Sequence, residues 1–441
     1  MKFISTKRES EPVSFSEAVL KGLAPDGGLY LPVEWPQLKE QFIENIHQKS
    51  LQDIGYEVSR LFVNELDSEM LRQVINDALN FDAPLVSLED STHILELFHG
   101  PTLAFKDFGA RFMSRIFSAF SEHQDQDIII LAATSGDTGS AVAQGFLGVE
   151  GIKVCLLYPS GKVSRLQEQQ LTTAGQNVTA LEVEGTFDDC QQMVKEAFSD
   201  TELNEQMVLS SANSINIARL IPQSFYYLYA LAQIGEKVKK APIFCVPSGN
   251  FGNLTAGLMA QKIGMPATGF IAATNVNDVV PEYLESGSFN PRPSKRTISN
   301  AMDVGNPSNF ARIEAMFGGD HEAVKKHIWG ASFSNQQTRE AVKKVKQETG
   351  YLLDPHTAVG YLAVQQYKDE ATGYFEEGED SPFIILSTAH PAKFGDIIEP
   401  VIGEEVTIPD RLAASLKKQK QSIKMDNDYG RLKQWLMQCY L

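Results

Sequence analysis

The sequence is poor in cysteine and histidine. Four cysteines and eight histidines are spread over 441 residues, and the cysteines lie far apart. Their spacing fits neither a zinc ribbon nor a dense disulfide framework, and small buried thiols are expected instead. Two histidine pairs, His93 with His99 and His321 with His327, are six residues apart, which does not place both rings on one helix face. The sequence therefore predicts no metal site.

Positive charge is also scarce. Lysine and arginine number 39 against 56 aspartate and glutamate residues, which gives a formal net charge of −17. An acidic surface repels phosphate backbones, so nucleic acid is not expected as a partner. An anionic small molecule would need a local positive site.

The chain has no long uninterrupted apolar run. Its longest uncharged stretch, residues 241–261, could span a bilayer, but it contains two prolines, three glycines and two asparagines. The first ten residues, MKFISTKRES, contain no apolar run, so no signal peptide is expected. We expect a cytoplasmic protein without a membrane partner, either a monomer or a homodimer.

Nucleotide-binding fingerprints are missing as well. Neither G-x-G-x-x-G nor G-x-x-x-x-G-K-[ST] occurs, so a nicotinamide-dependent dehydrogenase and a P-loop protein lose their main support. No internal repeat or low-complexity tract is present. The length alone favours about three domains.

From residue 127 onward, short apolar segments alternate with amphipathic ones. Strands are predicted at residues 128–133, 152–158, 178–183, 242–246, 270–273 and 383–387. Helices are predicted at residues 139–147, 163–172, 187–198, 215–234 and 254–263. Apolar strands separated by helices favour parallel pairing with both sheet faces covered, which predicts an α/β fold. Residues 275–310 are rich in Pro, Ser, Asn and Gly and are expected to form a lid or a long ordered loop.

Three predicted strands end in small, polar loops, at residues 133–140, 246–254 and 386–393. In the first two, glycines let several backbone N–H groups face one point, and the N-terminus of the next helix adds its positive dipole end. Both loops could bind an anion. The alternative is a tight turn in which Ser, Thr or Asn caps the helix.

Two further segments carry candidate cations. Lys106, in HGPTLAFKDFGAR, lies off the apolar stripe of its helix, beside Gly109, where a flat group could approach. Apolar surroundings lower a lysine pKa and favour the neutral, nucleophilic amine, although a lysine at a helix start is usually solvated. Asn213, Ser214 and Arg219 could form a clamp for phosphate or carboxylate, or an N-cap beside an exposed arginine.

Together these segments resemble the threonine synthase family, pyridoxal-phosphate enzymes of the fold-type-II (tryptophan synthase β-like) group. The resemblance rests on PDGGLYLP at residues 25–32, HGPTLAFKDFGAR, TSGDTGSA, NSIN, PSGNFGN and STAHPAKF. HGPTLAFKD with PSGNFGN is the most specific part, whereas TSGDTG also suits the dehydratase relatives. The resemblance implies two α/β lobes with parallel-rich sheets and a small, mainly helical N-terminal domain. The implied domains are residues 1–95, a cofactor-binding core at 96–400 with a smaller lobe nested at about 110–235, and a C-terminal helical segment at 401–441.

The resemblance also implies a role for each motif. Lys106 would carry pyridoxal phosphate as an internal aldimine and act as the main acid–base group, and the Thr388 hydroxyl would face the pyridine nitrogen. The cofactor phosphate would be bound by Gly249, Asn250, Phe251 and Asn253. The substrate carboxylate would be bound by Thr134, Ser135, Asp137 and Thr138. The substrate phosphate would be bound by Asn213, Ser214 and Arg219, with Lys162. Because a carboxylate repels a carboxylate, Asp137 must turn away or act through neighbouring N–H groups.

The implied reaction converts O-phospho-L-homoserine and water into L-threonine and phosphate by γ-elimination and β-hydration, the last step of threonine biosynthesis. One alternative is a threonine or serine dehydratase, which needs no second phosphate site. Another is a non-catalytic paralogue that only binds pyridoxal phosphate.

Overall fold

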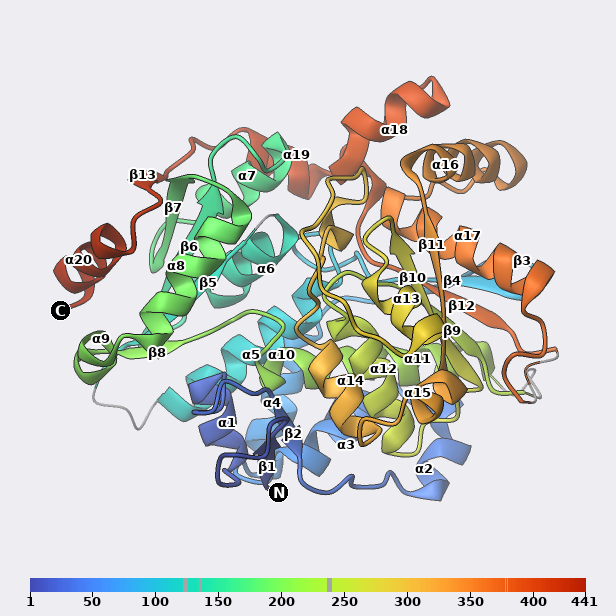
Figure 1. Ribbon diagram of the computed structural model, residues 1–441, viewed down its shortest axis with the longest axis horizontal. Coiled ribbons are helices and arrows are strands. Elements are labelled where there is room, and N and C mark those ends of the chain that lie inside the picture. Colours follow the sequence, from blue (N-terminus) through green and yellow to red (C-terminus); the bar gives the residue numbers. More distant parts are fainter. Residues whose placement is uncertain (122–125, 135, 236–239, 377, 379) are drawn as a thin grey trace.

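The computed structural model describes residues 1–441 except 122–125, 135, 236–239, 377 and 379. Two β-sheets organise the chain and lie toward opposite ends of the molecule (Figure 1). Within the described residues, none of the helices combines the length and apolar character needed to cross a bilayer.

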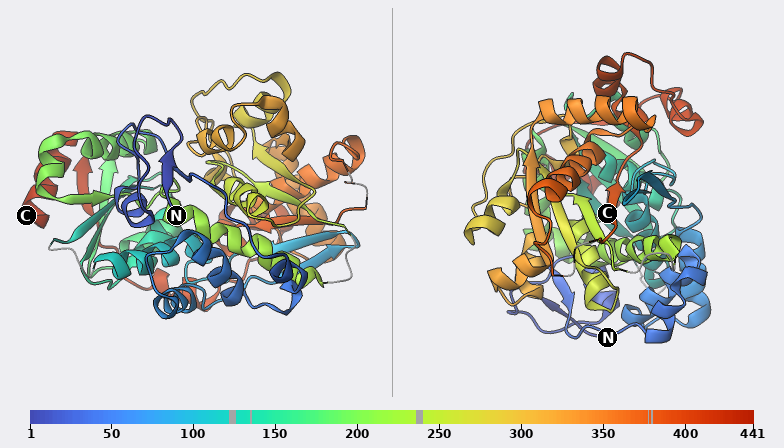
Figure 2. Two further views of the ribbon diagram at one scale, coloured as in Figure 1. Left: turned by 90° about the horizontal axis from the view of Figure 1, so that it is seen from below. Right: turned by 90° about the vertical axis from the view of Figure 1, so that its right-hand side faces the viewer.

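The larger sheet has six strands, and the helices that follow its strands cover it on both sides (Figure 2). Its strands are β3 (Leu85–Glu89), β4 (Thr92–Glu96), β9 (Ile243–Pro247), β10 (Gly269–Asn275), β11 (Ile328–Phe333) and β12 (Phe383–Ser387). The spatial order is β11-β10-β9-β12-β4-β3, and all neighbours are parallel except β3 and β4. β3 and β4 join this sheet although β3 precedes the expected boundary at residue 95 and β4 crosses it.

The smaller sheet has five parallel strands in the order β13-β7-β6-β5-β8. They are β5 (Ile128–Ala133), β6 (Ile152–Pro159), β7 (Val178–Glu184), β8 (Val208–Ser210) and β13 (Ile423–Asp426). Together with helices α6 (Asp137–Phe146), α7 (Arg165–Thr172), α8 (Phe187–Ser199) and α9 (Thr201–Gln206), they form what we call the smaller lobe. The predicted α/β fold with parallel-rich sheets is therefore confirmed.

The N-terminal residues form a short antiparallel pair and a group of helices. The pair is β1 (Phe3–Ser5) with β2 (Tyr30–Pro32). The helices are α1 (Phe15–Lys21), α2 (Glu40–Glu44), η1 (Ile46–Gln48, a 3-10 helix), α3 (Leu51–Phe62) and α4 (Ser68–Ala78). A capping box of Ser50 and Asp53 begins α3, which buries an apolar stripe. Ala78 is the last residue of α4, and its carbonyl accepts a hydrogen bond from Arg111 Nε (2.8 Å). The N-terminal helices therefore pack against the long helix α5 (Lys106–Ser121).

The remaining helices are α10 (Ile217–Leu220), α11 (Phe225–Ile234), α12 (Gly252–Lys262), α13 (Val279–Ser286), α14 (Phe310–Met316), α15 (His321–His327), α16 (Asn335–Thr349), α17 (Pro355–Glu370), α18 (Gly395–Ile402), α19 (Asp410–Leu416) and α20 (Tyr429–Tyr440). Of these helices, α10 and α11 follow β8 of the smaller sheet, and the others follow strands of the larger sheet or lie in the C-terminal segment. Three 3-10 helices accompany them: η2 (Ile221–Ser224), η4 (Asn300–Met302) and η5 (Pro391–Phe394).

Three local predictions differ from the structure. Residues 215–234 do not form one helix but α10, η2 and α11, because Pro222 lacks the N–H that a continuous α-helix needs. Residues 275–310, expected as a loop or lid, contain α13 and η4. The C-terminal segment contains strand β13, which pairs with β7, where only helix was expected.

Candidate active site

Lys106 is the first residue of α5, and main-chain contacts hold the loop before it. Phe105 N–H donates to the Thr388 carbonyl (2.9 Å), and Ala104 forms an antiparallel bridge with Ala389. These contacts attach the Lys106 loop, which follows β4, to the segment that follows β12. Lys106 and Thr388 therefore lie at the carboxyl-terminal edge of the larger sheet, where ligands collect in α/β proteins.

The Asp107 carboxylate fixes the shape of the same loop. It accepts hydrogen bonds from Thr102 N–H (2.8 Å) and from the Thr102 hydroxyl (2.7 Å). Gly100 makes room for it, since a Cβ there would lie 2.5 Å from Asp107 Oδ2. Burial raises the pKa of Asp107 to about 6, although both Thr102 bonds favour the charged form. The residue after Lys106 is thus an internal anchor of the loop.

The electrostatic surroundings of Lys106 favour its neutral form. Burial is the main cause that lowers the pKa of Lys106 to about 8, and the positive charges of Arg219 and Lys393 act in the same direction. The negative charge of Asp137 opposes this change. A lysine with a pKa near neutrality has a larger population of the nucleophilic amine than an ordinary lysine.

The PSGNFGN loop, between β9 and α12, makes its left-handed turn at Phe251 and not at a glycine. Phe251 is the N-cap of α12 and has a left-handed conformation (φ 59°). Gly249 packs against η4, because a Cβ at that position would lie 2.5 Å from the Ala301 carbonyl oxygen and 2.8 Å from Met302 Cα. The first N–H groups of α12 have no acceptor within the helix, so this end of the loop favours an anion.

Asn253, in the first turn of α12, carries an unsatisfied donor. Its Oδ1 accepts from the hydroxyls of Tyr226 (2.6 Å) and Tyr227 (2.9 Å), so the orientation of the amide is fixed. Its Nδ2 is buried and has no hydrogen-bond partner within the described residues. A buried N–H without a partner costs about 1–3 kcal/mol, which an anionic ligand would recover.

Thr388 is buried, and its chain neighbour Ser387 belongs to a buried polar network. The hydroxyls of Ser387 and Thr357 share a hydrogen bond (2.8 Å), and Thr357 in turn bonds Asp354. His356 Nδ1 lies 2.8 Å from Asp354 Oδ1, and its other ring nitrogen accepts a backbone N–H of η4 (3.2 Å). His356 thus joins the Thr388 side of the site to the wall of the PSGNFGN loop.

In the TSGDTG loop, the two threonines differ in role. Thr134 is buried, and its hydroxyl oxygen accepts from Gly136 N–H (3.1 Å) and Gly139 N–H (2.8 Å). Its side chain therefore holds the turn together, which is the capping alternative. Thr138 is partly buried, and Ser135 lies outside the described residues.

Asp137 is held in a buried ion pair. Its Oδ1 lies 2.5 Å from Lys393 Nζ and accepts from Gln167 Nε2 (3.1 Å). Burial alone would raise the pKa of Asp137, but the charges of Lys393 and Lys106 outweigh it and lower the pKa to about 2. Lys393 Nζ also donates to the Thr102 carbonyl (3.0 Å), so the pair links the smaller lobe to the Lys106 loop. The Asp137 carboxylate is therefore already neutralised by a cation.

Arg219 is buried rather than exposed, which excludes the solvated alternative. Its NH1 donates to the Ala212 carbonyl, while its Nε is buried without a partner within the described residues. A Cβ at Gly109 would lie 2.8 Å from Arg219 Nε. The expectation that Gly109 leaves room for a flat ligand is thus wrong, since Gly109 accommodates Arg219 one turn after Lys106.

Ser214 connects its own segment to the PSGNFGN loop and to Asn309. Its hydroxyl oxygen accepts from Asn250 Nδ2 (2.6 Å) and Asn309 Nδ2 (3.2 Å). Asn213 lies beside it, with a buried Oδ1 that has no partner within the described part of the chain. Lys162 is exposed, and the carboxylate on which its charge acts is that of Asp189 in α8. Lys162 is the one predicted cation that is not placed with the others.

Comparison with known proteins gives consistent results along the whole chain. A family model described as pyridoxal-phosphate dependent enzyme matches residues 82–387, and models of the N-terminal and C-terminal parts of threonine synthase match residues 2–79 and 357–436. A threonine synthase from Haemophilus influenzae is 41% identical over 99% of this chain and 100% of its own. The chain belongs to the threonine synthase family.

Solved structures of threonine synthases have the same fold. The enzyme from Escherichia coli is 39% identical, with a TM-score of 0.91 over 99% of this chain and 100% of that one. A threonine synthase from Brucella melitensis, solved with bound pyridoxal phosphate, is 34% identical, with a TM-score of 0.91 over 100% and 99% of the two chains. The chain is thus a fold-type-II enzyme of the lyase class, and pyridoxal phosphate is its cofactor.

The site in this threonine synthase family member fits a pyridoxal phosphate group. Lys106 supplies a primary amine of lowered pKa to bond the aldehyde. The unpartnered Asn253 Nδ2 and the free N–H groups that begin α12 suit the phosphate. Thr388, in the segment bonded to the Lys106 loop, supplies a hydroxyl. An amine, a hydroxyl and an anion cradle are the groups that this cofactor needs.

The pKa of Lys106 predicts how cofactor attachment depends on pH. With a pKa of about 8, the fraction of Lys106 in the neutral form rises about tenfold per pH unit below pH 8 and levels off above it. We therefore expect the attachment rate in the cofactor-free protein, followed by stopped-flow absorbance, to rise and then reach a plateau above pH 8. The reference is free lysine, whose rate keeps rising towards about pH 10. A protein profile parallel to that reference would contradict the lowered pKa.

Two buried cations near this site were not assigned from the sequence. Lys393 lies in the recognised STAHPAKF motif, where its apolar neighbours are a signal of burial, but nothing local indicates its bond to Asp137. Arg312, in α14, donates to the Ser214 carbonyl (3.2 Å) and has no sequence signal of any kind. Both act across segments that are distant in the chain.

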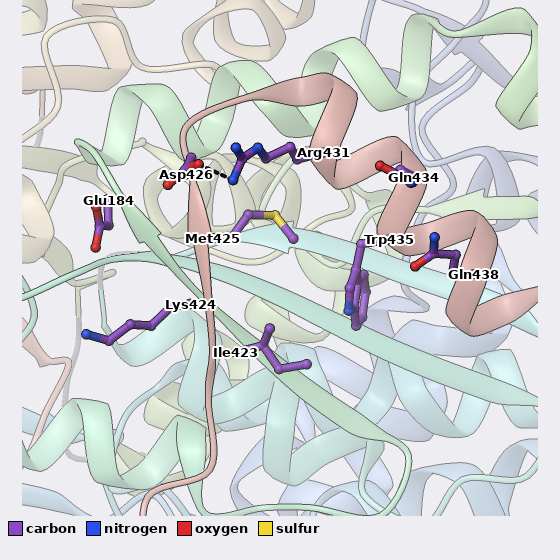
Figure 3. A pocket seen from close by; sticks show the side chains of 9 residues that line it. All are labelled: Glu184, Ile423, Lys424, Met425, Asp426, Arg431, Gln434, Trp435 and Gln438. Carbon is purple, nitrogen blue, oxygen red and sulfur yellow. Dashed lines mark ion pairs between the residues drawn. The ribbon is translucent and has the colours of Figure 1, made fainter.

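A separate hollow of about 550 Å³ lies between β13 and α20 (Figure 3). Figure 3 shows Trp435 and Ile423 toward one end of its lining and the ion pair of Asp426 with Arg431 toward the other. The other lining residues are Glu184, Lys424, Met425, Gln434 and Gln438. None of them belongs to the Lys106 site, so this hollow is not part of it.

Proposed function

We propose that the chain converts O-phospho-L-homoserine and water into L-threonine and inorganic phosphate. The observation that supports this proposal, beyond family membership, is a buried cation with an unpartnered donor beside α5. Arg219 is buried one turn from Lys106, and its Nε has no partner within the described residues. A phosphate that leaves during the reaction needs such a cation, whereas a hydroxyamino-acid dehydratase releases no phosphate.

In this proposal Lys106 removes the α proton of the substrate and later returns a proton to the same carbon. When bound, pyridoxal phosphate supplies the electron sink for negative charge at that carbon. Gly249, Asn250, Phe251 and Asn253 would hold the cofactor phosphate, and Thr388 would offer its hydroxyl to the ring nitrogen.

The substrate would be bound at its two anionic ends. The TSGDTG loop, with Thr134, Ser135, Asp137 and Thr138, takes the carboxylate. Because Asp137 is paired with Lys393, we assign this recognition to the backbone N–H groups of the turn and the Thr138 hydroxyl. The phosphate is taken by Asn213, Ser214 and Arg219. Lys162 could join them only by moving in from the exposed surface.

The direct test is product analysis. The purified chain, saturated with pyridoxal phosphate, is incubated with O-phospho-L-homoserine, and phosphate and threonine are measured together. Equal amounts of both products are expected. Release of 2-oxo acid from threonine or serine at a higher kcat/KM than phosphohomoserine turnover would instead identify a dehydratase.

Replacing Arg219 tests the substrate phosphate site. Loss of a charge-assisted hydrogen bond is worth about 1.5–3 kcal/mol, so Arg219→Ala is expected to lower kcat/KM for phosphohomoserine about 10- to 100-fold. Arg219→Lys keeps the charge and is expected to recover part of the loss. Arg60→Ala, on the exposed face of α3, is the control. Unchanged turnover in Arg219→Ala would show that the substrate needs no cation at this position.

The setting of the enzyme follows from the same proposal. We propose that it acts in the cytoplasm on small molecules alone, as a monomer or a homodimer. The net charge of −17 opposes nucleic-acid binding, and the four free cysteines suit a reducing compartment.

A further inference from the structure

Arg312 is a buried cation whose partners are neutral. Its side chain is 0% exposed, and burial lowers its pKa to about 9. It donates to the carbonyls of Tyr30 (3.1 Å), Ser214 (3.2 Å) and Ile215 (2.6 Å), and to the Asn309 side-chain oxygen (2.6 Å). Within the described residues, none of its acceptors is a carboxylate. A buried guanidinium with only neutral acceptors leaves a net positive field around the groups that it contacts.

Arg312 also fixes the direction of the hydrogen bonds that run from it through Asn309 to Ser214. A guanidinium has donors only, so Asn309 must present Oδ1 to it. The Nδ2 of Asn309 then points the other way and donates to Ser214 Oγ (3.2 Å). The orientation of this amide therefore follows from the chemistry of Arg312.

The side-chain amide of Asn250 also donates a hydrogen bond to the Ser214 hydroxyl. Ser308 backbone N–H donates to Asn250 Oδ1 (2.6 Å), and a backbone N–H cannot accept. Asn250 Nδ2 must therefore be the donor in its contact with Ser214 Oγ (2.6 Å). Asn250 belongs to the PSGNFGN loop, so this contact lies beside the cofactor phosphate site.

These two contacts leave the Ser214 hydroxyl able only to donate a hydrogen bond. A hydroxyl oxygen has two acceptor positions, and the amides of Asn250 and Asn309 fill both. The remaining capacity of Ser214 is its O–H, which can only donate. A donor beside a loop of free backbone N–H groups recognises an acceptor that carries negative charge.

We propose that Arg312 is a positioning residue that, through Asn309, fixes the Ser214 hydroxyl as a hydrogen-bond donor to a phosphate monoester. Two phosphate monoesters are available at this site, that of the cofactor and that of the substrate. The cofactor case rests only on the assigned family, whereas the substrate case rests on the proposed function. The experiment separates them.

The informative variant is Asn309→Asp. A carboxylate at this position still accepts from Arg312 and gives the buried cation a counter-ion, so the fold is expected to be retained. It cannot donate to Ser214, however, and it adds negative charge beside the phosphate. Asn290→Asp, at an exposed position, adds the same charge elsewhere and is the matched control. Arg312→Lys is a second variant, which keeps the charge but loses the fork geometry.

Cofactor affinity is measured by titrating the cofactor-free full chain with pyridoxal phosphate and, separately, with pyridoxal, which lacks the phosphate. If the cofactor phosphate is the acceptor, Asn309→Asp weakens binding of pyridoxal phosphate about tenfold or more and leaves pyridoxal binding unchanged. If the substrate phosphate is the acceptor, both titrations are unchanged and KM for phosphohomoserine rises about tenfold, with a smaller change in kcat.

Dependence on Ser214 completes the test. In a Ser214→Ala background, Asn309→Asp is expected to have a clearly smaller further effect on whichever quantity it changes, because the part that acts through the hydroxyl is already lost and only the added charge remains. The proposal is overturned if neither quantity changes, if full additivity is found, or if pyridoxal and pyridoxal phosphate weaken equally while the melting temperature falls. If the wild-type chain does not turn over phosphohomoserine, the proposed function fails, but the contrast between the two cofactor titrations still decides the role of Arg312.

Discussion

Replacing Lys106 by alanine is expected to reduce threonine formation by about 10⁴-fold or more, because one amine both bonds the cofactor and moves the α proton. The purified variant should also lack the visible absorbance of the lysine-bound cofactor. Borohydride reduction of the wild-type chain, followed by peptide mass analysis, should place the label on Lys106. Labelling of another lysine would reject the assignment of this residue.

Loss of activity alone would not separate chemistry from folding, so this prediction includes two controls. Lys344→Ala, at an exposed position of α16, removes a lysine of ordinary surroundings and should leave activity unchanged. A small primary amine added to Lys106→Ala should restore part of the turnover, since the cavity left by the side chain admits it. A variant that keeps both the absorbance band and turnover would contradict the proposed role.

The sequence predicts the strands of this fold well because their signal is local. Residues 128–133 form an uninterrupted apolar run and are buried at every position of β5, and residues 383–387 form β12 as predicted. Lys106 and the PSGNFGN loop are candidates from local chemistry, since a lysine off the apolar stripe and a glycine-rich strand end are visible in a few residues, whereas their roles come from the family resemblance. A few consecutive residues are enough to predict features of this kind.

Features that depend on distant contacts could not be predicted in the same way. Thr134 has the residue type of a ligand, but its hydroxyl is used within its own turn. Gly109 suggested space for a ligand, yet the space is filled by Arg219 from another segment. Arg312 has no local signal, because its importance lies in the direction of hydrogen bonds among residues of three separate segments.

The buried pair of Lys393 and Asp137 shows the same dependence on distant contacts and carries the second large prediction. Lys393→Met would leave the Asp137 carboxylate buried without its cation, and removing one partner of a buried pair typically costs about 3–5 kcal/mol. We expect a loss of this size in the free energy of unfolding at neutral pH, measured by urea denaturation. Asp137→Asn should destabilise by a similar mechanism, because it leaves Lys393 charged and buried.

The double variant distinguishes an ion pair from two independent residues. Lys393→Met with Asp137→Asn removes both charges, so its loss should be clearly smaller than the sum of the two single losses. Additive losses would mean that the two side chains contribute separately and that the pair is not the source of the stability.

The pH dependence of the same variants gives an independent check with a defined sign. In the wild-type chain the pKa of Asp137 is lowered to about 2, so its contribution to stability is present at neutral pH and is lost as the pH falls from about 4 towards 2. Lys393→Met removes the charge and the hydrogen bond that lower the pKa of Asp137, while burial still raises it. This pKa is therefore higher than in the wild type, and acidification should narrow the difference in stability between the two chains. At neutral pH the unpaired carboxylate would also face the substrate carboxylate and raise KM for phosphohomoserine. Adding Asp137→Asn should lower that KM again, because it removes the repelling charge, whereas a general packing defect would not be relieved.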